Sequence, residues 1–286
     1  MSVPRHLDPG PLVAPTRVMA TSGELAALVA TPPEGVVRRP GVLAVPGYTG
    51  SKEDFLHLLP LLSAAGHPVT AIDLRGQHES GGPEDVAAYT VAALAADIAS
   101  LLGAGEKLHL VGHSFGGLVC REAVLGAAPV RSLALIGSGP GALGGTRGGL
   151  IELMRPLLAD GGVAAVWEVS EALDAEDPTK ASLPADIKDF LRRRFLASPS
   201  AALLGMGTAA TTAPDRTDEL RHSGIATLVG YGSLDDAWSP AEQREMAERL
   251  GIDPVVFDGA GHSPAVDVPE AVAAALETFW STLDPT

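Results

Sequence analysis

The segment G-H-S-F-G at residues 112–116 constrains the fold of this chain more than any other feature of its sequence. It lies between a short apolar run, 107–111, typical of a buried strand and a segment, 117–125, typical of a helix. A serine between a strand and a helix has to occupy a very sharp turn, and the flanking glycines remove Cβ atoms that would clash with both neighbours. Such a turn lifts the hydroxyl above the sheet and aims helix N–H groups at whatever the hydroxyl attacks. The context therefore marks Ser114 as a candidate nucleophile.

Strand-like and helix-like segments alternate through most of the chain, which predicts a mostly parallel sheet covered by helices on both faces. The expected strands are a hairpin of 17–20 and 25–30, followed by 41–45, 68–72, 108–111, 132–136, 225–229 and 255–257. The expected helices are 51–65, 86–102, 117–125, 240–250 and 269–283.

The alternation stops between about residues 141 and 221, where helix-like segments occur without a convincing strand. The candidate helices are 150–160, 163–173, 184–197 and 200–210, separated by proline and glycine. We expect this stretch to form a cap over the carboxyl edge of the sheet, where open α/β sheets bind ligands.

The composition bounds the possible partners and the redox chemistry. The chain has 286 residues, 46% of them hydrophobic, which is enough to bury a large core. A net charge of −15 argues against nucleic acid or an anionic membrane surface as a partner. The single cysteine, Cys120, excludes an intrachain disulfide, and we expect it to be a small buried hydrophobe. Neither a signal-peptide stretch nor a run near the roughly 18 apolar residues of a membrane span is present, so we expect a cytoplasmic protein.

A serine hydroxyl is a poor nucleophile at neutral pH and needs an imidazole to accept its proton. Of the eight histidines, His262 alone lies in a loop after the last expected strand, between Gly261 and Pro264. The acid that orients this imidazole is expected between serine and histidine in chain order. Asp235 and Asp236 follow the strand 225–229; we choose Asp235 and keep Asp236 as the alternative.

An oxyanion hole requires backbone donors aimed at the developing charge, each worth about 3–4 kcal/mol. We expect one donor to be the N–H of Phe115, directly after the candidate nucleophile. The other should come from the glycine-rich turn after the strand 41–45, where Tyr48 is the candidate.

Five segments, in this order along the chain, resemble α/β-hydrolase-fold enzymes. The segment P-G-Y-T-G-S at 46–51 resembles their H-G-[FY]-x-G-S segment, and D-L-R-G-Q-H-E-S at 73–80 resembles their D-x-R-G-x-G-x-S loop. The other three are 112–117, similar to the nucleophile elbow, 232–240, similar to the acid loop, and 261–264, similar to the histidine loop. The resemblance covers about residues 15–284.

The resemblance implies an α/β-hydrolase fold: a mostly parallel eight-stranded sheet flanked by helices, with a helical cap inserted after strand 6. The core would comprise 1–140 and 222–286, and the cap 141–221 of the same domain. The implied reaction is hydrolysis of a carboxylic ester or thioester of a small, mostly apolar substrate by Ser114, His262 and Asp235. No metal or organic cofactor is required, and no H-E-x-x-H, C-x-x-C or paired-histidine pattern indicates a metal. Epoxide hydrolases and haloalkane dehalogenases of this fold use aspartate at the elbow, where this chain has serine.

Two departures from the family pattern, together with one residue of the elbow, concern possible substrate contacts. Pro46 stands where the family usually has histidine, and His78 replaces the second glycine of the D-x-R-G-x-G-x-S loop. We expect His78 near the pocket mouth and His113, inside the elbow, to pack or hydrogen-bond locally. His78, His113 and Trp238 are our candidates for substrate binding. The arginine run 192–194 is expected on a solvated helix face, with binding of a substrate carboxylate as the alternative.

Other functions of the same fold stay open at this point. The same triad serves acyltransferases, peptidases, C–C hydrolases and some non-hydrolytic cyclases, and some proteins of the fold bind small molecules without catalysis. The intact set of serine, histidine and aspartate disfavours a protein that binds small molecules without catalysis. Substrate identity and oligomeric state are not indicated by the sequence.

Overall fold

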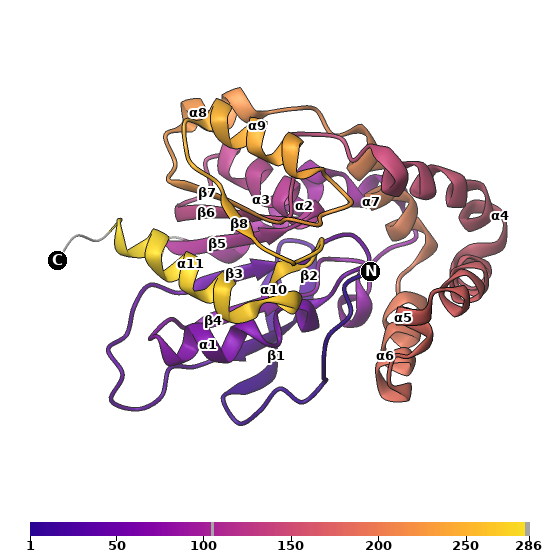
Figure 1. The fold of residues 1–286 in the computed structure, drawn as a ribbon, viewed down its shortest axis with the longest axis horizontal. Helices are drawn as coiled ribbons and strands as arrows, with labels where there is room; N and C mark the ends of the chain where they lie inside the picture. The colour runs from indigo at the N-terminus through magenta and orange to yellow at the C-terminus, as the bar shows by residue number, and fades with distance from the viewer. Residues whose placement is uncertain (104–105, 284–286) are drawn as a thin grey trace.

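A computed structural model describes residues 1–103 and 106–283, so that the last three residues of the expected core range, 284–286, lie outside it. One eight-stranded sheet runs through the body of the molecule in the order β1-β2-β4-β3-β5-β6-β7-β8 (Figure 1). β2 is antiparallel to its neighbours β1 and β4, and every later pairing is parallel. The strands are β1 Val13–Ala20, β2 Gly23–Ala30, β3 Val42–Val45, β4 Val69–Ile72, β5 Leu108–His113, β6 Val130–Ile136, β7 Thr227–Gly232 and β8 Val255–Phe257. The expected fold class is confirmed.

Helices cover both faces of the sheet. α1 (Leu58–Ala64) and α11 (Pro269–Ser281) lie together on one face, whereas α2 (Val91–Leu102), α3 (Phe115–Leu125), α8 (Thr217–Ser223) and α9 (Pro240–Leu250) cover the other (Figure 1). The short helix α10 (Pro264–Asp267) precedes α11. Alternate residues of one strand enter different cores: Leu43 and Val45 join the α2–α3 side, and Val42 and Ala44 join the α1–α11 side. The period of two along a strand explains why all four are buried.

Two of the expected helices are each divided by a local signal. The segment 51–65 forms a 3-10 turn, η1 (Lys52–Phe55), and then α1. Pro60 explains the break, because it has no N–H and is tolerated only in the first turn of a helix. The segment 86–102 likewise forms η3 (Val86–Tyr89) and then α2, because the extended Thr90 caps α2 through a hydrogen bond from Ala93 N to its side-chain oxygen.

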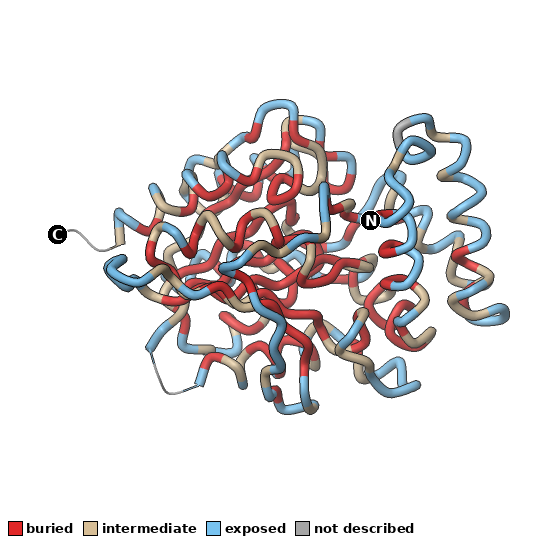
Figure 2. The backbone as a smooth tube through the Cα atoms, turned by 90° about the horizontal axis from the view of Figure 1, so that it is seen from below, coloured by how far each residue is buried: buried red, intermediate tan, exposed pale blue. Residues whose placement is uncertain are grey.

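The helices after β6 project beyond one end of the sheet (Figure 1). They are α4 (Gly145–Glu176), α5 (Pro178–Ala181), α6 (Ala185–Leu196) and α7 (Ser200–Thr212). α4 is kinked at Gly162, where φ is 72°, so it consists of two helical parts as the sequence predicts. The tube in Figure 2 shows buried residues concentrated in the sheet and its flanking helices, whereas much of this helical part is exposed.

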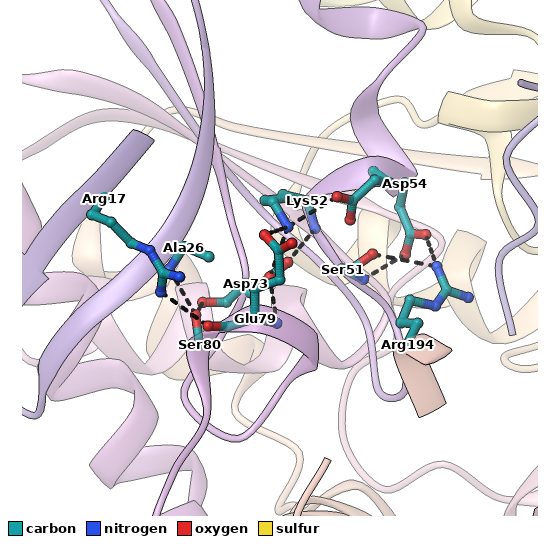
Figure 3. A network of polar contacts seen from close by, with 10 residues as sticks. Arg17, Ala26, Ser51, Lys52, Asp54, Asp73, Glu79, Ser80 and Arg194 are labelled. Carbon is teal, nitrogen blue, oxygen red and sulfur yellow. Dashed lines mark hydrogen bonds and ion pairs between the residues drawn. The ribbon is translucent and has the colours of Figure 1, made fainter. Parts of the chain in front are cut away.

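A buried ion pair joins α6 to the body of the molecule (Figure 3). Arg194 donates to Oδ1 of Asp54 at 2.8 Å and to the carbonyl oxygen of Ser2 at 2.7 Å. The expectation that residues 192–194 form a solvated face is therefore wrong for Arg194, which is 1% exposed, and holds for its two exposed neighbours. The helical period explains this difference, because Arg194 lies on the same face as the buried Phe190 and Leu191.

Candidate active site

Ser114 occupies a strained turn between β5 and α3. Its φ of 54° and ψ of −124° are unusual for a non-glycine residue, and such conformations cost of order 1–3 kcal/mol. The neighbouring glycines make the turn possible: a Cβ on Gly112 would lie 2.6 Å from Cα of Gly117, and one on Gly116 would lie 2.4 Å from the carbonyl oxygen of Pro46. The turn therefore places the Ser114 hydroxyl at the end of β5, and the backbone of Ser114 is strained as a result.

A continuous chain of hydrogen bonds connects three residues from distant parts of the sequence. The hydroxyl of Ser114 donates to Nε2 of His262, with the two atoms 2.8 Å apart. Nδ1 of His262 donates to Oδ1 of Asp235 at 2.9 Å. The carboxylate neighbour assigns the proton to Nδ1 and leaves Nε2 as the acceptor that faces the serine. The structure thus brings together the three residues that the sequence analysis selected.

The two adjacent aspartates have different surroundings. Asp235 is buried, and besides His262 it accepts hydrogen bonds from Ala237 N and from Nε2 of Gln243, both at 2.9 Å. The side chain of Asp236 is 65% exposed and pairs with Arg147 at 2.6 Å. Only Asp235 of these two carboxylates contacts His262. Gln243, on α9, was not singled out from the sequence, where nothing distinguishes it from other helical glutamines.

His113 holds the backbone of the histidine loop. Its Nε2 donates to the carbonyl oxygen of His262 at 2.8 Å. Burial, and secondarily the neighbouring His262, lower the pKa of His113 to about 3, so this ring stays neutral at ordinary pH. The local hydrogen bond expected for His113 is present, and the residue also contributes to the wall of the cavity.

The turn after β3 lies directly against the candidate nucleophile. A Cβ on Gly47 would be 2.9 Å from Cβ of Ser114, so only glycine fits there. The N–H of the next residue, Tyr48, has no acceptor among the described residues. Phe115 is the first residue of α3, where N–H groups lack partners within the helix. Both candidate oxyanion donors therefore flank Ser114.

A cavity of about 390 Å³ opens next to Ser114 and His262, and both of these residues line it. Tyr48 contributes to its wall, and the hydroxyl of Tyr48 donates to the carbonyl oxygen of Leu203 in α7 at 3.1 Å. Much of the remaining lining is apolar and comes from the helices after β6, including Ile151, Met154, Leu158, Leu191 and Phe195. The cavity can therefore hold an apolar group beside the serine hydroxyl.

Two of the candidate substrate-binding residues lie outside the cavity lining, although the ring centroid of Trp238 is 6.4 Å from that of His262. Among the described residues, those that line the cavity include neither His78 nor Trp238. The ring of His78 packs edge-on against Phe190, with ring centroids 5.6 Å apart. Trp238 is buried, and its Nε1 donates to the carbonyl oxygen of Ala142 at 3.3 Å. These loop side chains are directed by packing partners far along the chain, which the local sequence does not show.

We also searched the described part of the chain for metal-binding clusters and for membrane-spanning helices. No group of three or more histidine, cysteine or acidic side chains is arranged there to hold a metal ion. None of its helices is both long enough and apolar enough to cross a bilayer.

Comparison with known proteins identifies the family. A family model described as "Alpha/beta hydrolase family" matches residues 42–275, so the chain belongs to the α/β hydrolase family. The expected family is thereby confirmed.

Epoxide hydrolase A of Mycobacterium tuberculosis (strain ATCC 25618 / H37Rv) is 34% identical over 115 residues, which are 39% of this chain and 35% of that protein. RutD of Variovorax paradoxus (strain S110) is 40% identical over 98 residues, 33% of this chain and 36% of the relative. The chain thus aligns with about a third of the length of these curated relatives. A solved structure of a thermophilic esterase from Thermogutta terrifontis superposes with a TM-score of 0.73 at 24% identity, over 94% of this chain and 99% of that one, which shows the shared fold.

Proposed function

We propose that this protein is a serine hydrolase that cleaves a carboxylic ester or thioester of a small, mostly apolar substrate. The observation that carries the proposal is the hydrogen-bond chain from Ser114 through His262 to Asp235 at the wall of the cavity. A hydroxyl that donates to an imidazole, which in turn donates to a buried carboxylate, is the arrangement that makes serine a nucleophile.

In the acylation step, Oγ of Ser114 attacks the carbonyl carbon while its proton moves to Nε2 of His262. The N–H groups of Tyr48 and Phe115 donate to the oxyanion of the tetrahedral intermediate, and Asp235 stabilises the imidazolium. Collapse of the intermediate breaks the bond to the alkoxide or thiolate, which leaves with the proton from Nε2. An acyl ester of Ser114 remains.

In the deacylation step, a water molecule gives one proton to His262 and attacks the acyl carbonyl carbon. The second tetrahedral intermediate collapses, the carboxylic acid leaves, and Oγ of Ser114 recovers the proton from Nε2. The net reaction consumes one ester and one water and forms one acid and one alcohol or thiol.

The serine nucleophile favours a carbonyl substrate over an epoxide. Attack of a serine oxygen on an epoxide carbon would form an ether, and water cannot hydrolyse that ether through a carbonyl. An acyl-serine has the carbonyl that deacylation requires. We therefore do not propose epoxide hydrolysis, the activity in the name of one relative, for this chain.

We further propose that residues 141–221 form the cap of a single domain whose core is 1–140 and 222–286, except that α8 (Thr217–Ser223), at the end of this range, packs on α3 and α9 beside the sheet. The apolar lining contributed by α4, α6 and α7 supports this division, because those helices would then select the acyl or alcohol group.

Hydrolysis of p-nitrophenyl esters from acetate to decanoate, with acyl thioesters in parallel, tests the proposal. The native protein should hydrolyse members of the panel, and Ser114→Ala should reduce kcat by at least about 10⁴-fold. Normal turnover by a pure Ser114→Ala preparation would contradict the mechanism.

A further inference from the structure

The side chain of Gln77 contacts the turn that carries Tyr48. Gln77 lies in the loop 73–80 after β4 and is only 2% exposed. Its Nε2 donates to the carbonyl oxygen of Gly47 at 2.8 Å. Its Oε1 accepts from the N–H of Leu74 at 3.0 Å. Because an N–H must face the Gly47 oxygen and an oxygen must face the Leu74 N–H, the two contacts fix the orientation of the amide.

The contacted carbonyl belongs to the same peptide group as the Tyr48 N–H. The described residues include no cis peptide bond, and in a planar trans peptide the C=O and the N–H point in opposite directions. The Gly47 oxygen accepts from Gln77 and also from Gly50 N at 3.0 Å. Two donors on the oxygen therefore set the direction of the Tyr48 N–H on the other side of the peptide.

The loop that carries Gln77 is itself fixed at both ends (Figure 3). Asp73 accepts from the backbone N of Lys52 at 2.7 Å and from its Nζ at 3.0 Å. The hydroxyl of Ser80 donates to the carbonyl oxygen of Asp73 at 2.8 Å and accepts from Ala26 N at 2.9 Å. Gln77 thus reaches Gly47 from a rigid support.

We propose that Gln77 is a positioning residue of the oxyanion hole: by holding the Gly47 carbonyl, it aims the Tyr48 N–H at the oxyanion that forms on Ser114. This inference rests on the proposed function. Donation to the carbonyl also polarises the peptide and strengthens its N–H as a donor. Loss of a complete oxyanion donor costs about 10²–10³-fold in kcat, so a misdirected donor should cost part of that.

Two substitutions of similar size separate the donor from the shape of the side chain. Gln77→Met removes both polar atoms, and Gln77→Glu keeps an acceptor for Leu74 N but replaces the donor to Gly47. We expect both variants to lower kcat for a p-nitrophenyl ester roughly 10- to 100-fold while KM changes less than about threefold, because the interaction acts in the transition state. Unchanged kcat in both variants, or a raised KM with unchanged kcat, would overturn the proposal.

The pH dependence of kcat in the Gln77→Glu variant provides a second test, because a purely structural role of Gln77 would not change with pH. Burial raises the pKa of a carboxyl group, and a protonated Glu side chain can again donate to the Gly47 oxygen. The ratio of Gln77→Glu to native kcat should therefore rise between pH 8 and pH 5, whereas the Gln77→Met ratio should stay flat. Taking the ratio to the native protein cancels the titration of the general base. Flat ratios for both variants would overturn the assignment of the effect to the donor.

Arg17→Met is the control beside the same loop, because it removes an exposed hydrogen bond to the carbonyl oxygen of Glu79 without touching Asp73, Gln77 or Gly47. It should leave kcat within about twofold of native. A loss of kcat as large as that of Gln77→Met would indicate general loosening of the loop and overturn the proposal.

Labelling of native Ser114 by a fluorophosphonate distinguishes failure of the proposed function from failure of the role of Gln77. If the native protein is not labelled, the proposed function fails; if it is labelled and the Gln77 variants retain full kcat, only the role of Gln77 fails.

Discussion

Nε2 of Gln243 donates at 2.9 Å to Oδ2 of Asp235, the carboxylate oxygen that does not contact His262. Gln243 is fully buried, and the same Nε2 also donates to the carbonyl oxygen of Trp238 at 2.8 Å. The helix α9 therefore contributes a side chain that binds the Asp235 carboxylate on the side away from His262. Oδ1 of Asp235 accepts from Ala237 N as well as from the imidazole of His262. Each carboxylate oxygen of Asp235 therefore has at least one donor other than His262.

Replacing Gln243 by the similarly shaped methionine should loosen this carboxylate. We expect Gln243→Met to lower kcat by roughly tenfold and the free energy of unfolding by about 1–3 kcal/mol, because Asp235 Oδ2 and Trp238 O lose a buried donor. Steady-state kinetics and urea denaturation measure the two effects. A stability loss without any change in kcat would show that the contact serves folding alone.

The adjacent aspartates provide a matched pair of substitutions. Asp235→Asn should reduce kcat by about 10³–10⁴-fold, because the amide no longer stabilises the imidazolium or selects the Nδ1–H tautomer. Asp236→Asn removes only an exposed ion pair with Arg147 and should change kcat less than about twofold. Equal effects of the two substitutions on kcat would exclude the assigned orientation of His262.

The buried pair between Arg194 and Asp54 predicts an asymmetric effect on stability. Arg194→Met leaves the Asp54 carboxylate buried without its cation and should lower the free energy of unfolding by about 3–5 kcal/mol. The double variant Arg194→Met/Asp54→Leu should recover most of that loss, since the uncompensated charge is gone. Chemical denaturation of the three proteins measures the difference. If the double variant is no more stable than the single one, the loss does not come from the unpaired charge.

The buried His109 predicts loss of stability in acid. Its Nδ1 lies 2.8 Å from the Ser132 hydroxyl, its ring stacks on Trp280, and burial lowers its pKa to about 3. An unfolded histidine has a pKa near 6.5, so between about pH 6.5 and pH 3 the unfolded chain binds a proton that the folded chain does not. The free energy of unfolding should therefore fall as pH decreases through this window, with up to about 1.4 kcal/mol per pH unit from this group.

The variant His109→Gln keeps a polar partner for Ser132 and removes the titration. Urea denaturation at pH 7, 6, 5 and 4 should show a shallower fall for His109→Gln than for the native protein. An identical pH slope for both proteins would mean that His109 is not the group responsible.

The fold could be predicted from the sequence because its signals are local. The apolar pattern of a single strand, the glycines around Ser114 and the loop that contains His262 are each visible within about ten consecutive residues. The break at Pro60 is also visible in the sequence, because a proline is tolerated only in the first turn of a helix and the helix must therefore begin shortly before it. The burial of Arg194 is indicated by its helical spacing of four and three residues from the apolar Phe190 and Leu191.

The contacts that complete the site depend on packing between distant segments. Gln77 and Gly47 are thirty positions apart, and their hydrogen bond exists only because the loops after β3 and β4 lie side by side. His78 and Trp238 are candidates for substrate binding from the sequence, but Phe190 and the backbone at Ala142 set the directions of their side chains. The roles of Ser114, His262 and Asp235 in catalysis stay predictions until they are measured.

The most direct measurement is the mass of the intact protein after reaction with a fluorophosphonate, followed by peptide mapping. An activated serine that is aligned with an oxyanion hole reacts with this electrophile, whereas an ordinary serine does not. We expect one adduct per chain, located on Ser114, and no adduct in the variant Ser114→Ala or in the heat-unfolded protein. An unlabelled native protein, or an adduct on another residue, would contradict the assignment of Ser114 as the nucleophile.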